Sequence, residues 1–258
     1  MSGLTPPASP YEAGRTHCVD CVEGMRALGD ATVDLLLADP PFNLDNKGRM
    51  FRSGRLALCQ DMAWDQIDNG PWLAEALRVI KPTGTLIVFG SWHNVFDLGS
   101  RLQQANVRIL NTIALVKTGG FAVSHRVLYE RTLYAIWASP SGRDWCFDYG
   151  LLKRLSGRQA CNVWPYTPPS ARSHPTQKGV DVLERMVLMA SRPGALVLDP
   201  FMGSGTTAEA CLRQGRKFLG FEKSPVYAAA ANARIHCLRW AADFAVQTRR
   251  AVSCPSAA

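Results

Sequence analysis

The chain has no hydrophobic segment long enough to cross a membrane and no secretory signal. None of its apolar stretches approaches the roughly 20 residues that a bilayer requires. The Pro-rich start, Met1 to Pro10, contains neither the basic nor the apolar part of a signal peptide. We therefore expect a cytoplasmic protein.

The cysteines follow no disulfide or metal-binding pattern. Eight of them are scattered between Cys18 and Cys254, a poor fit to a disulfide framework in a chain of 258 residues. Cys18 and Cys21 form a CxxC pair, but no second pair completes a zinc site. Reduced thiols and no bound metal are expected.

The composition is that of one enzyme-sized globular domain. The sequence shows no internal repeat or heptad pattern, and 47% hydrophobic with 19% charged residues can bury a full core. We expect a single domain over residues 15–250 between disordered tails at 1–14 and 251–258. The net charge of +8 favours a polyanionic partner without identifying one, because many basic proteins bind no nucleic acid.

Short apolar segments alternate with amphipathic ones along most of the chain. Buried strands that alternate with helices indicate an α/β fold with a mostly parallel central sheet covered on both faces. Strands 109–116 and 132–137 are expected to pair as an antiparallel hairpin at the edge of that sheet. The other predicted strands are 16–20, 33–38, 85–89, 195–198 and 217–221, and the predicted helices are 21–28, 72–80, 94–105, 180–191 and two that begin near 206 and 227.

Two segments depart from this alternation. Residues 43–61 are polar and basic and show little periodicity, which predicts a mobile loop. Residues 139–173 are rich in Gly, Pro, Arg and aromatic residues and also lack a clear period. This second segment is predicted to be an insertion into the fold.

A glycine-rich turn follows the strand at 195–198. In Asp199-Pro200-Phe201-Met202-Gly203-Ser204-Gly205-Thr206-Thr207, two glycines one residue apart allow the backbone to approach a ligand closely. The turn lacks the third glycine of the dinucleotide fingerprint and the lysine of a phosphate-binding loop, which favours a nucleoside without phosphate. The next strand ends at Glu222, where this architecture places a carboxylate that binds ribose hydroxyls. Glycines that serve packing alone are the alternative.

The tetrapeptide Asp39-Pro40-Pro41-Phe42 directly follows the apolar strand at 33–38. It therefore lies at the carboxyl edge of the sheet, where open α/β sheets bind their ligands. An aromatic amine is a poor nucleophile because its lone pair is delocalised, and acceptors for its N–H groups draw the nitrogen toward tetrahedral geometry. The Asp39 carboxylate and the Pro40 carbonyl supply such acceptors, and the prolines add no competing donor. Phe42 offers a flat face to an extruded base, although a rigid Asp-Pro turn with a core Phe is the alternative.

In combination, these motifs resemble the β-class (permuted) DNA amino-methyltransferases, which use S-adenosylmethionine to modify adenine N6 or cytosine N4. The resemblance covers roughly residues 16–237. Gly179 stands where the family usually has Pro, a departure that concerns only the start of the local helix. Five separated motifs carry the resemblance in the family's order: Cys18 to Met25, Ala31 to Asn43, Leu77 to Gly84 with Phe89-Gly90, Ser173-His174-Pro175-Thr176-Gln177-Lys178, and Gly220-Phe221-Glu222 with Tyr227.

The resemblance implies a Rossmann-like methyltransferase fold with circularly permuted motif order, and S-adenosylmethionine as the cofactor. Asp20 would contact the cofactor's adenine, Glu222 its ribose, and the glycine turn its amino-acid part. The implied catalytic residues are Asp39, Pro40, Pro41 and Phe42. The implied cofactor-binding residues are Asp20, Asp39, His174, Thr176, Lys178, Asp199, Phe201, Gly203, Ser204, Gly205, Thr206 and Glu222. The candidate DNA-binding residues are Lys47, Arg49, Arg52 and Arg55 in the predicted loop.

Double-stranded DNA is the expected partner, in the nucleoid of a bacterium or a phage-infected cell, and a homodimer is a further expectation. Adenine N6 is favoured over cytosine N4 because cytosine-N4 members tend to have Ser in place of Asp39. A cytosine-C5 enzyme is disfavoured, since the chain has no Pro-Cys pair. An RNA substrate and a non-catalytic DNA binder are the remaining alternatives. Residues 43–61 and 139–173 are the expected readers of the DNA sequence, and no further recognition domain is expected after the last helix.

Overall fold

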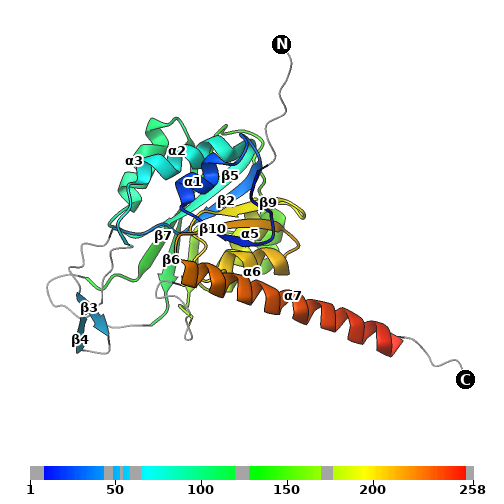
Figure 1. Ribbon diagram of the computed structural model, residues 1–258. Helices are drawn as coiled ribbons and strands as arrows, with labels where there is room; N and C mark the ends of the chain where they lie inside the picture. Colours follow the sequence, from blue (N-terminus) through cyan, green and yellow to red (C-terminus); the bar gives the residue numbers. More distant parts are fainter. Residues whose placement is uncertain are drawn as a thin grey trace, which may run out of the picture.

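The computed structural model describes residues 9–43, 49–52, 55–58, 65–119, 128–169 and 177–253. In these ranges the chain forms an eight-stranded sheet with helices on both faces (Figure 1). All of its strands run in the same direction except β7, which is antiparallel to both of its neighbours. In spatial order the strands are β1 (Thr16–Cys18), β10 (Lys217–Glu222), β9 (Leu196–Asp199), β2 (Val33–Ala38), β5 (Ile80–Gly90), β7 (Thr132–Ser139), β6 (Arg108–Lys117) and β8 (Val163–Tyr166).

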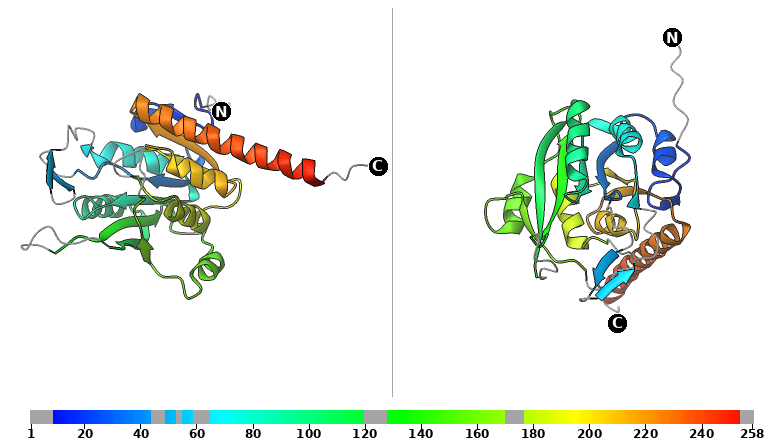
Figure 2. Two further views of the ribbon diagram at one scale, coloured as in Figure 1. Left: turned by 90° about the horizontal axis from the view of Figure 1, so that it is seen from below. Right: turned by 90° about the vertical axis from the view of Figure 1, so that its left-hand side faces the viewer.

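The helices divide between the two faces of the sheet (Figures 1 and 2). One face packs against α1 (Cys21–Arg26), α2 (Asn69–Val79) and α3 (Val95–Gln104). The other packs against α4 (Tyr149–Ser156), α5 (Val180–Ala190), α6 (Thr206–Arg213) and the first turns of α7 (Pro225–Ser253).

The central strand β2 shows why helices cover both faces of the sheet. Leu35 and Leu37 belong to the apolar cluster on one face, and Leu36 and Ala38 belong to the cluster on the other. Successive side chains of a strand point to opposite faces, so consecutive positions of a strand buried on both sides are apolar, as at Leu35 to Ala38. The apolar run within 33–38 therefore predicted a strand covered on both faces correctly.

The predicted start of β5 was wrong. The strand begins at Ile80 instead of Thr85 and pairs there with Val33, after which the register jumps to Thr85 opposite Leu35. The residues between, Lys81 to Gly84, form an irregularity within the strand, and Lys81 Nζ lies 2.6 Å from Asp34 Oδ1. The helix α2 ends at Val79, within one residue of the predicted end, so proline and glycine here follow the end of a helix and also mark an interruption of the strand pairing.

Part of the region 139–173 belongs to the sheet, which the sequence did not predict. It supplies α4 and β8, and β8 pairs in parallel with β6. The predicted hairpin of β6 and β7 therefore exists, but β8 and not the hairpin forms the edge of the sheet. Trp164 and Tyr166 are buried in the core while Val163 and Pro165 are exposed. A strand of four residues is too short for this alternation to be recognised in the sequence.

The segment predicted as an irregular loop at 43–61 also contains strands. β3 (Arg49–Arg52) pairs with β4 (Arg55–Leu58) as a separate two-stranded antiparallel sheet, seen apart from the main sheet in Figure 1. Only Ser53 and Gly54 separate the strands in the sequence, a spacing typical of hairpins. The absence of regular structure was predicted wrongly, and the mobility of the segment stays a prediction.

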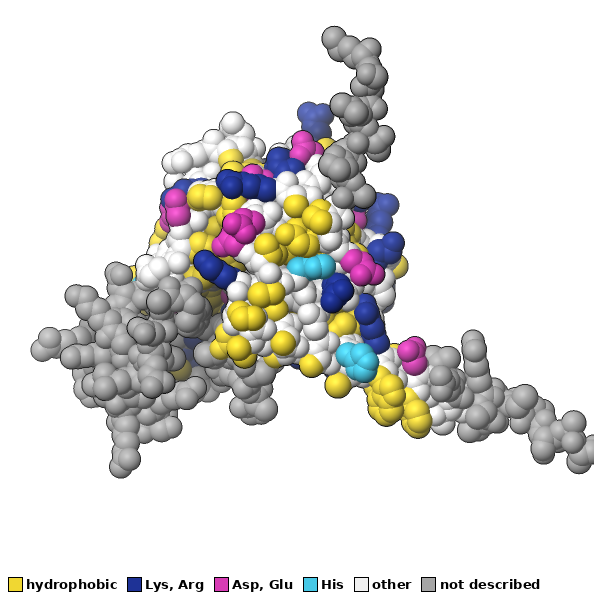
Figure 3. Space-filling view, viewed as in Figure 1, with side chains coloured by type: hydrophobic (Ala, Val, Ile, Leu, Met, Phe, Trp, Pro, Cys, Tyr) yellow, Lys and Arg dark blue, Asp and Glu magenta, His cyan; other side chains and the backbone are white. Residues whose placement is uncertain are grey.

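Residues 9–14 and 251–253 were assigned to disordered tails from the sequence, and the structure describes both segments. Gly14 N donates to Phe218 O at 2.6 Å, and the Tyr11 ring packs on Phe221 with 5.1 Å between ring centroids. At the other end α7 continues to Ser253 and projects beyond the sheet (Figures 1 and 2), with Trp240 63% and Phe244 57% exposed. Figure 3 shows apolar side chains on this projecting part. In the described ranges, no helix combines the length and the apolarity that crossing a membrane requires.

The contact between Gly205 and α7 allows a test of the packing. Gly205 has φ +82, and a Cβ there would lie 3.1 Å from both Ala231 Cα and Cβ. Gly157 has φ +64 and no heavy atom within 4 Å of its Cβ position. We predict that Gly205→Ala lowers the free energy of unfolding by about 3 kcal/mol, against about 1 kcal/mol for Gly157→Ala, which carries backbone strain alone. Urea denaturation measures both, and equal losses would contradict the packing role.

Candidate active site

Four neighbouring strands bring acidic side chains to one edge of the sheet. Asp39 follows β2, Asp199 ends β9, Glu222 ends β10, and Asp20 lies just beyond β1. Because β1, β10, β9 and β2 are adjacent and parallel, their carboxyl ends meet at the same edge. All four residues line one cavity of about 620 Å³.

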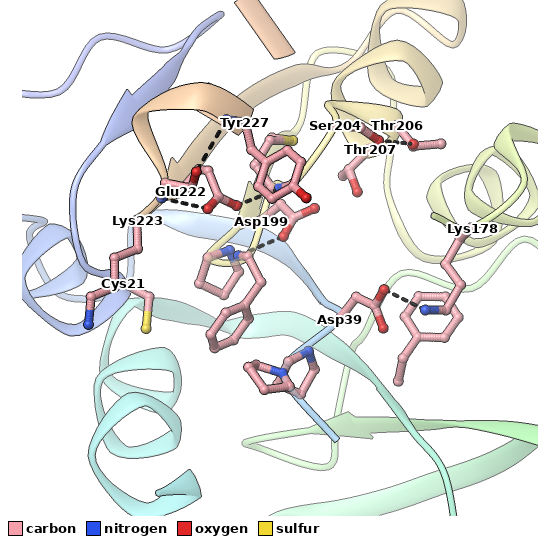
Figure 4. A pocket seen from close by; sticks show the side chains of 18 of the residues that line it. Cys21, Asp39, Lys178, Asp199, Ser204, Thr206, Thr207, Glu222, Lys223 and Tyr227 are labelled. Carbon is pink, nitrogen blue, oxygen red and sulfur yellow. Dashed lines mark hydrogen bonds and ion pairs between the residues drawn. The ribbon is translucent and has the colours of Figure 1, made fainter. Parts of the chain in front are cut away.

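Asp39 is held by a lysine from a distant part of the chain. Lys178 Nζ lies 2.5 Å from Asp39 Oδ2, and Figure 4 shows the two side chains pointing toward one another across the cavity wall. The lysine is only 5% exposed, and its Nζ lies 5.1 Å and 5.2 Å from the ring centroids of Phe42 and Phe89. The second oxygen, Asp39 Oδ1, is buried without a hydrogen-bond partner among the residues that the structure describes. The Asp39 side chain as a whole lines a ligand-sized cavity, and this oxygen is the buried acceptor within it.

Two side chains that the sequence did not point to fasten the loop after Asp39. Asn94 Nδ2 donates to the Pro41 carbonyl at 3.4 Å, and the Phe42 amide donates to Asp65 Oδ1 at 2.8 Å. Both Asn94 and Asp65 are 2% exposed. Asp65 is 23 residues beyond Phe42, on the far side of the polar segment, so no local pattern links the two.

The two glycines of the turn have different tasks. Gly203 lines the cavity with φ +53, and the nearest atom to a Cβ there is Phe201 O at 3.9 Å, so the space beside it is open to a ligand. Gly205 does not line the cavity and packs on α7. The sequence assigned both glycines to the cofactor, and the structure gives Gly205 a packing role.

Most of the other predicted site residues lie in or beside the cavity. Glu222 fastens the turn, since its Oε2 accepts from Gly203 N at 2.9 Å and its Oε1 from Ser224 N at 2.8 Å. Asp20 caps α1 by accepting from Val22 N at 2.9 Å. Pro40, Pro41, Phe201, Ser204 and Thr206 line the cavity, as do Lys223 and Tyr227, which the sequence had not assigned to the site. His174, Thr176 and Lys47 lie outside the described residues, and so do the side chains of Arg49, Arg52 and Arg55.

Asp199 is buried at the centre of the site and lines the cavity. Burial raises the pKa of its carboxyl from 3.8 to about 7, and the negative charges of Asp39 and Glu222 act in the same direction. Hydrogen bonds from the Thr207 side chain and the Phe201 amide, the latter at 2.9 Å, lower the pKa and only partly offset burial. Within the described ranges, no three His, Cys, Asp or Glu side chains converge as metal ligands would.

Comparison with known proteins shows the family. Residues 33–233 match the family model of N6/N4 DNA methylases, described as DNA methylase, and the chain belongs to this family. It is 34% identical over 221 residues to the Type II methyltransferase M2.DpnII of Streptococcus pneumoniae, covering 79% of this chain and 82% of that protein.

Solved structures show the same fold. A crystal structure of an M1.HpyAVI–SAM complex aligns with TM-score 0.64 at 24% identity over 85% of this chain and 98% of that one. The PvuII DNA methyltransferase, described as cytosine-N4-specific, aligns with TM-score 0.66 at 17% identity over 86% of each chain. The Rossmann-like methyltransferase fold was thus predicted correctly. That the motif order, with Asp39 ahead of the glycine turn, arose by circular permutation stays a prediction.

The raised pKa of Asp199 predicts a pH-dependent stability. Because its folded-state pKa lies above the unfolded value of 3.8, the contribution is complete below that value and is lost as pH rises through about 7. From pH 5 to pH 8, the free energy of unfolding of the wild type should fall by about 2 kcal/mol relative to Asp199→Asn, a neutral isostere. Urea denaturation at the two pH values measures the difference, and parallel pH profiles of the two proteins would refute the assignment.

Proposed function

We propose that this protein transfers a methyl group from S-adenosylmethionine to the exocyclic N6 amine of an adenine extruded from double-stranded DNA. The observation that carries the proposal is the state of the Asp39 carboxylate. One oxygen is fixed by Lys178, and the other is buried with no donor among the described residues, in a side chain that lines the cavity. The Pro40 carbonyl and the Phe42 ring belong to the same loop and the same cavity wall.

The cavity suits S-adenosylmethionine, a nucleoside that carries a sulfonium and an amino acid but no phosphate. Gly203 leaves open space where a Cβ would stand, and carboxylates of Asp20 and Glu222 at adjacent strand ends can accept from amine and hydroxyl groups. His174, Thr176 and Lys178 are proposed to hold the amino-acid end together with the turn at Asp199 and Phe201. When bound, the cofactor supplies a methyl group that is already activated on sulfur.

The protein's own residues need to orient the amine and exclude water. In our proposal the Asp39 carboxylate and the Pro40 carbonyl accept from the two N–H groups and draw the nitrogen lone pair out of conjugation with the ring. Phe42 stacks on the base, and Lys178 keeps the Asp39 carboxylate in place from the side away from the amine. A covalent nucleophile is not needed for this transfer.

Replacing Asp39 tests the proposal most simply. We expect Asp39→Ala to slow methyl transfer to DNA by at least about 100-fold, because one acceptor for the target amine is lost in the transition state. The affinity for S-adenosylmethionine should change little. Radiolabelled methyl transfer and calorimetry measure the two quantities, with the exposed Asp30→Ala as a control at wild-type rate. Near-normal turnover of Asp39→Ala would contradict the catalytic role of Asp39. Loss of cofactor binding in this variant would assign Asp39 to the cofactor site.

The identity of the methylated base is the more specific part of the proposal. Asp39 favours adenine, whereas cytosine N4 is the second candidate because a cytosine-N4-specific enzyme has the same fold. Nucleoside analysis of methylated DNA separates N6-methyladenine from N4-methylcytosine. If RNA is the substrate instead, methylated product forms only with RNA. A homodimer stays a prediction, which analytical ultracentrifugation tests.

Gly203 tests the cofactor site. A side chain there would enter the open space in the cavity and would be strained at φ +53. We predict that Gly203→Val abolishes measurable binding of S-adenosylmethionine by calorimetry. Gly157→Val, at a similar φ outside the cavity, should bind normally despite similar strain. Unchanged affinity in Gly203→Val would remove the turn from the cofactor site.

The pair of strands β3 and β4 is proposed to contact DNA phosphates through Arg49, Arg52 and Arg55, together with Lys47 of the preceding segment. The region 139–173 is proposed to contact the bases and so to recognise the DNA sequence. Each lost phosphate contact should reduce the slope of log affinity against log salt by about 0.9. Neutralising all four cations should therefore flatten the slope measured by fluorescence anisotropy. An unchanged slope would mean that the hairpin is only a solvated surface.

A further inference from the structure

The loop after Asp39 is joined to a distant segment by four hydrogen bonds. The Phe42 amide donates to Asp65 Oδ1 at 2.8 Å, and the Asn43 amide donates to the Asp65 carbonyl at 3.0 Å. Asn43 returns the contact with its side chain, since Nδ2 donates to Ile67 O at 3.0 Å and Oδ1 accepts from Ile67 N at 2.8 Å. We call these contacts the 42–67 clamp.

The clamp uses both backbone donors that follow the two prolines. Pro40 and Pro41 have no N–H group, so Phe42 and Asn43 carry the first amides after Asp39, and both donate to Asp65. Asp65 is 2% exposed and lines the cavity beside Phe42. A carboxylate that accepts from a backbone amide at such a buried position fixes that amide more firmly than a neutral acceptor would.

Asn43 has an unusual backbone conformation, which its own side chain stabilises. Its φ of +53 is a left-handed conformation that few residues other than glycine adopt, and Asn is among those that tolerate it. The side chain bridges the amide and the carbonyl of one residue, Ile67, which holds this conformation in place. The chain therefore leaves the cavity wall at a fixed angle directly after Phe42.

We propose that Asp65 is a positioning residue for methyl transfer, which acts on the target base through Phe42. By fixing the Phe42 amide, Asp65 sets the plane on which the base stacks and the place of the preceding prolines relative to Asp39. The inference rests on the proposed function, because it assigns the Phe42 ring to the target base. It concerns the rate of the chemical step and not the binding of the cofactor.

A purely structural role would give a different result, and the chain offers a matched control. Asn232 also bridges one residue, accepting from Thr16 N at 2.9 Å and donating to Thr16 O at 2.8 Å, and it does not line the cavity. Asn232→Ala thus removes the same type of link as Asn43→Ala at a site away from the chemistry. Asp65→Asn keeps an oxygen that can accept from the Phe42 amide, whereas Asp65→Ala does not.

The experiment compares these four variants with the wild type in single-turnover methyl transfer at saturating S-adenosylmethionine and DNA. Asp65→Ala and Asn43→Ala should be slower by about 10- to 100-fold, the effect of a misplaced reacting geometry, with cofactor affinity within about twofold. Asp65→Asn should recover most of the rate, and Asn232→Ala should react at the wild-type rate even if it melts as early as Asn43→Ala. Hydrogen exchange of the Phe42 amide should be fast in Asp65→Ala and slow in Asp65→Asn.

Several results would overturn the inference. Asp65→Ala at the wild-type rate, or a rate loss that Asn232→Ala shares at equal stability, would reduce the clamp to a structural link. Loss of cofactor binding in Asp65→Ala would assign Asp65 to the cofactor instead. A wild-type protein that methylates no nucleic acid would contradict the proposed function itself and the inference with it, whereas an active wild type with a fully active Asp65→Ala contradicts the inference alone.

Discussion

The buried ion pair between Asp39 and Lys178 is the interaction on which the rest of the site depends. It joins the end of β2 to the segment that enters α5 across 139 residues of sequence. Taking a charge out of water costs several kcal/mol, and a partner at contact distance offsets that cost. An Asp39 that turned away from Lys178 would give up this compensation. The pair thus fixes one carboxylate oxygen and leaves the other without a donor among the described residues, in a side chain that lines the cavity.

The parallel sheet explains why so many acidic groups meet at one edge. Parallel strands place their carboxyl ends side by side, so each βα loop adds its side chains to the same cavity. The structure distributes the carboxylates among different tasks: Asp39 contacts Lys178, Glu222 accepts backbone amides of the glycine turn, and Asp20 caps α1. Asp199, between Asp39 and Glu222, has the pKa of its carboxyl raised to about 7, so three negative charges need not stand together at neutral pH.

Elements with long or continuous patterns could be predicted from the sequence, and those defined by tertiary pairing could not. The apolar run of β2 and the start of α6 at Thr206 were predicted correctly because burial and the turn glycines leave local signals. β8 and the β3–β4 pair have four residues per strand and were missed. Gly203 and Gly205 give the same local signal, and only the position of Ala231 in α7 distinguishes the glycine that lines the cavity from the one that packs on a helix. The partnerships of Asp39 with Lys178 and of Phe42 with Asp65 depend on side chains brought together by the fold.

We propose that Lys178 serves methyl transfer by holding the Asp39 carboxylate in place. The measurement that tests it most directly is a double-mutant cycle with Asp39→Asn and Lys178→Met, read as single-turnover methyl transfer at saturating cofactor. If the two residues act as a unit, each variant is slow and the double variant is no slower than Asp39→Asn alone. Rate losses that multiply in the double variant, or a Lys178→Met protein that differs from the wild type only in its affinity for S-adenosylmethionine, would contradict the claim.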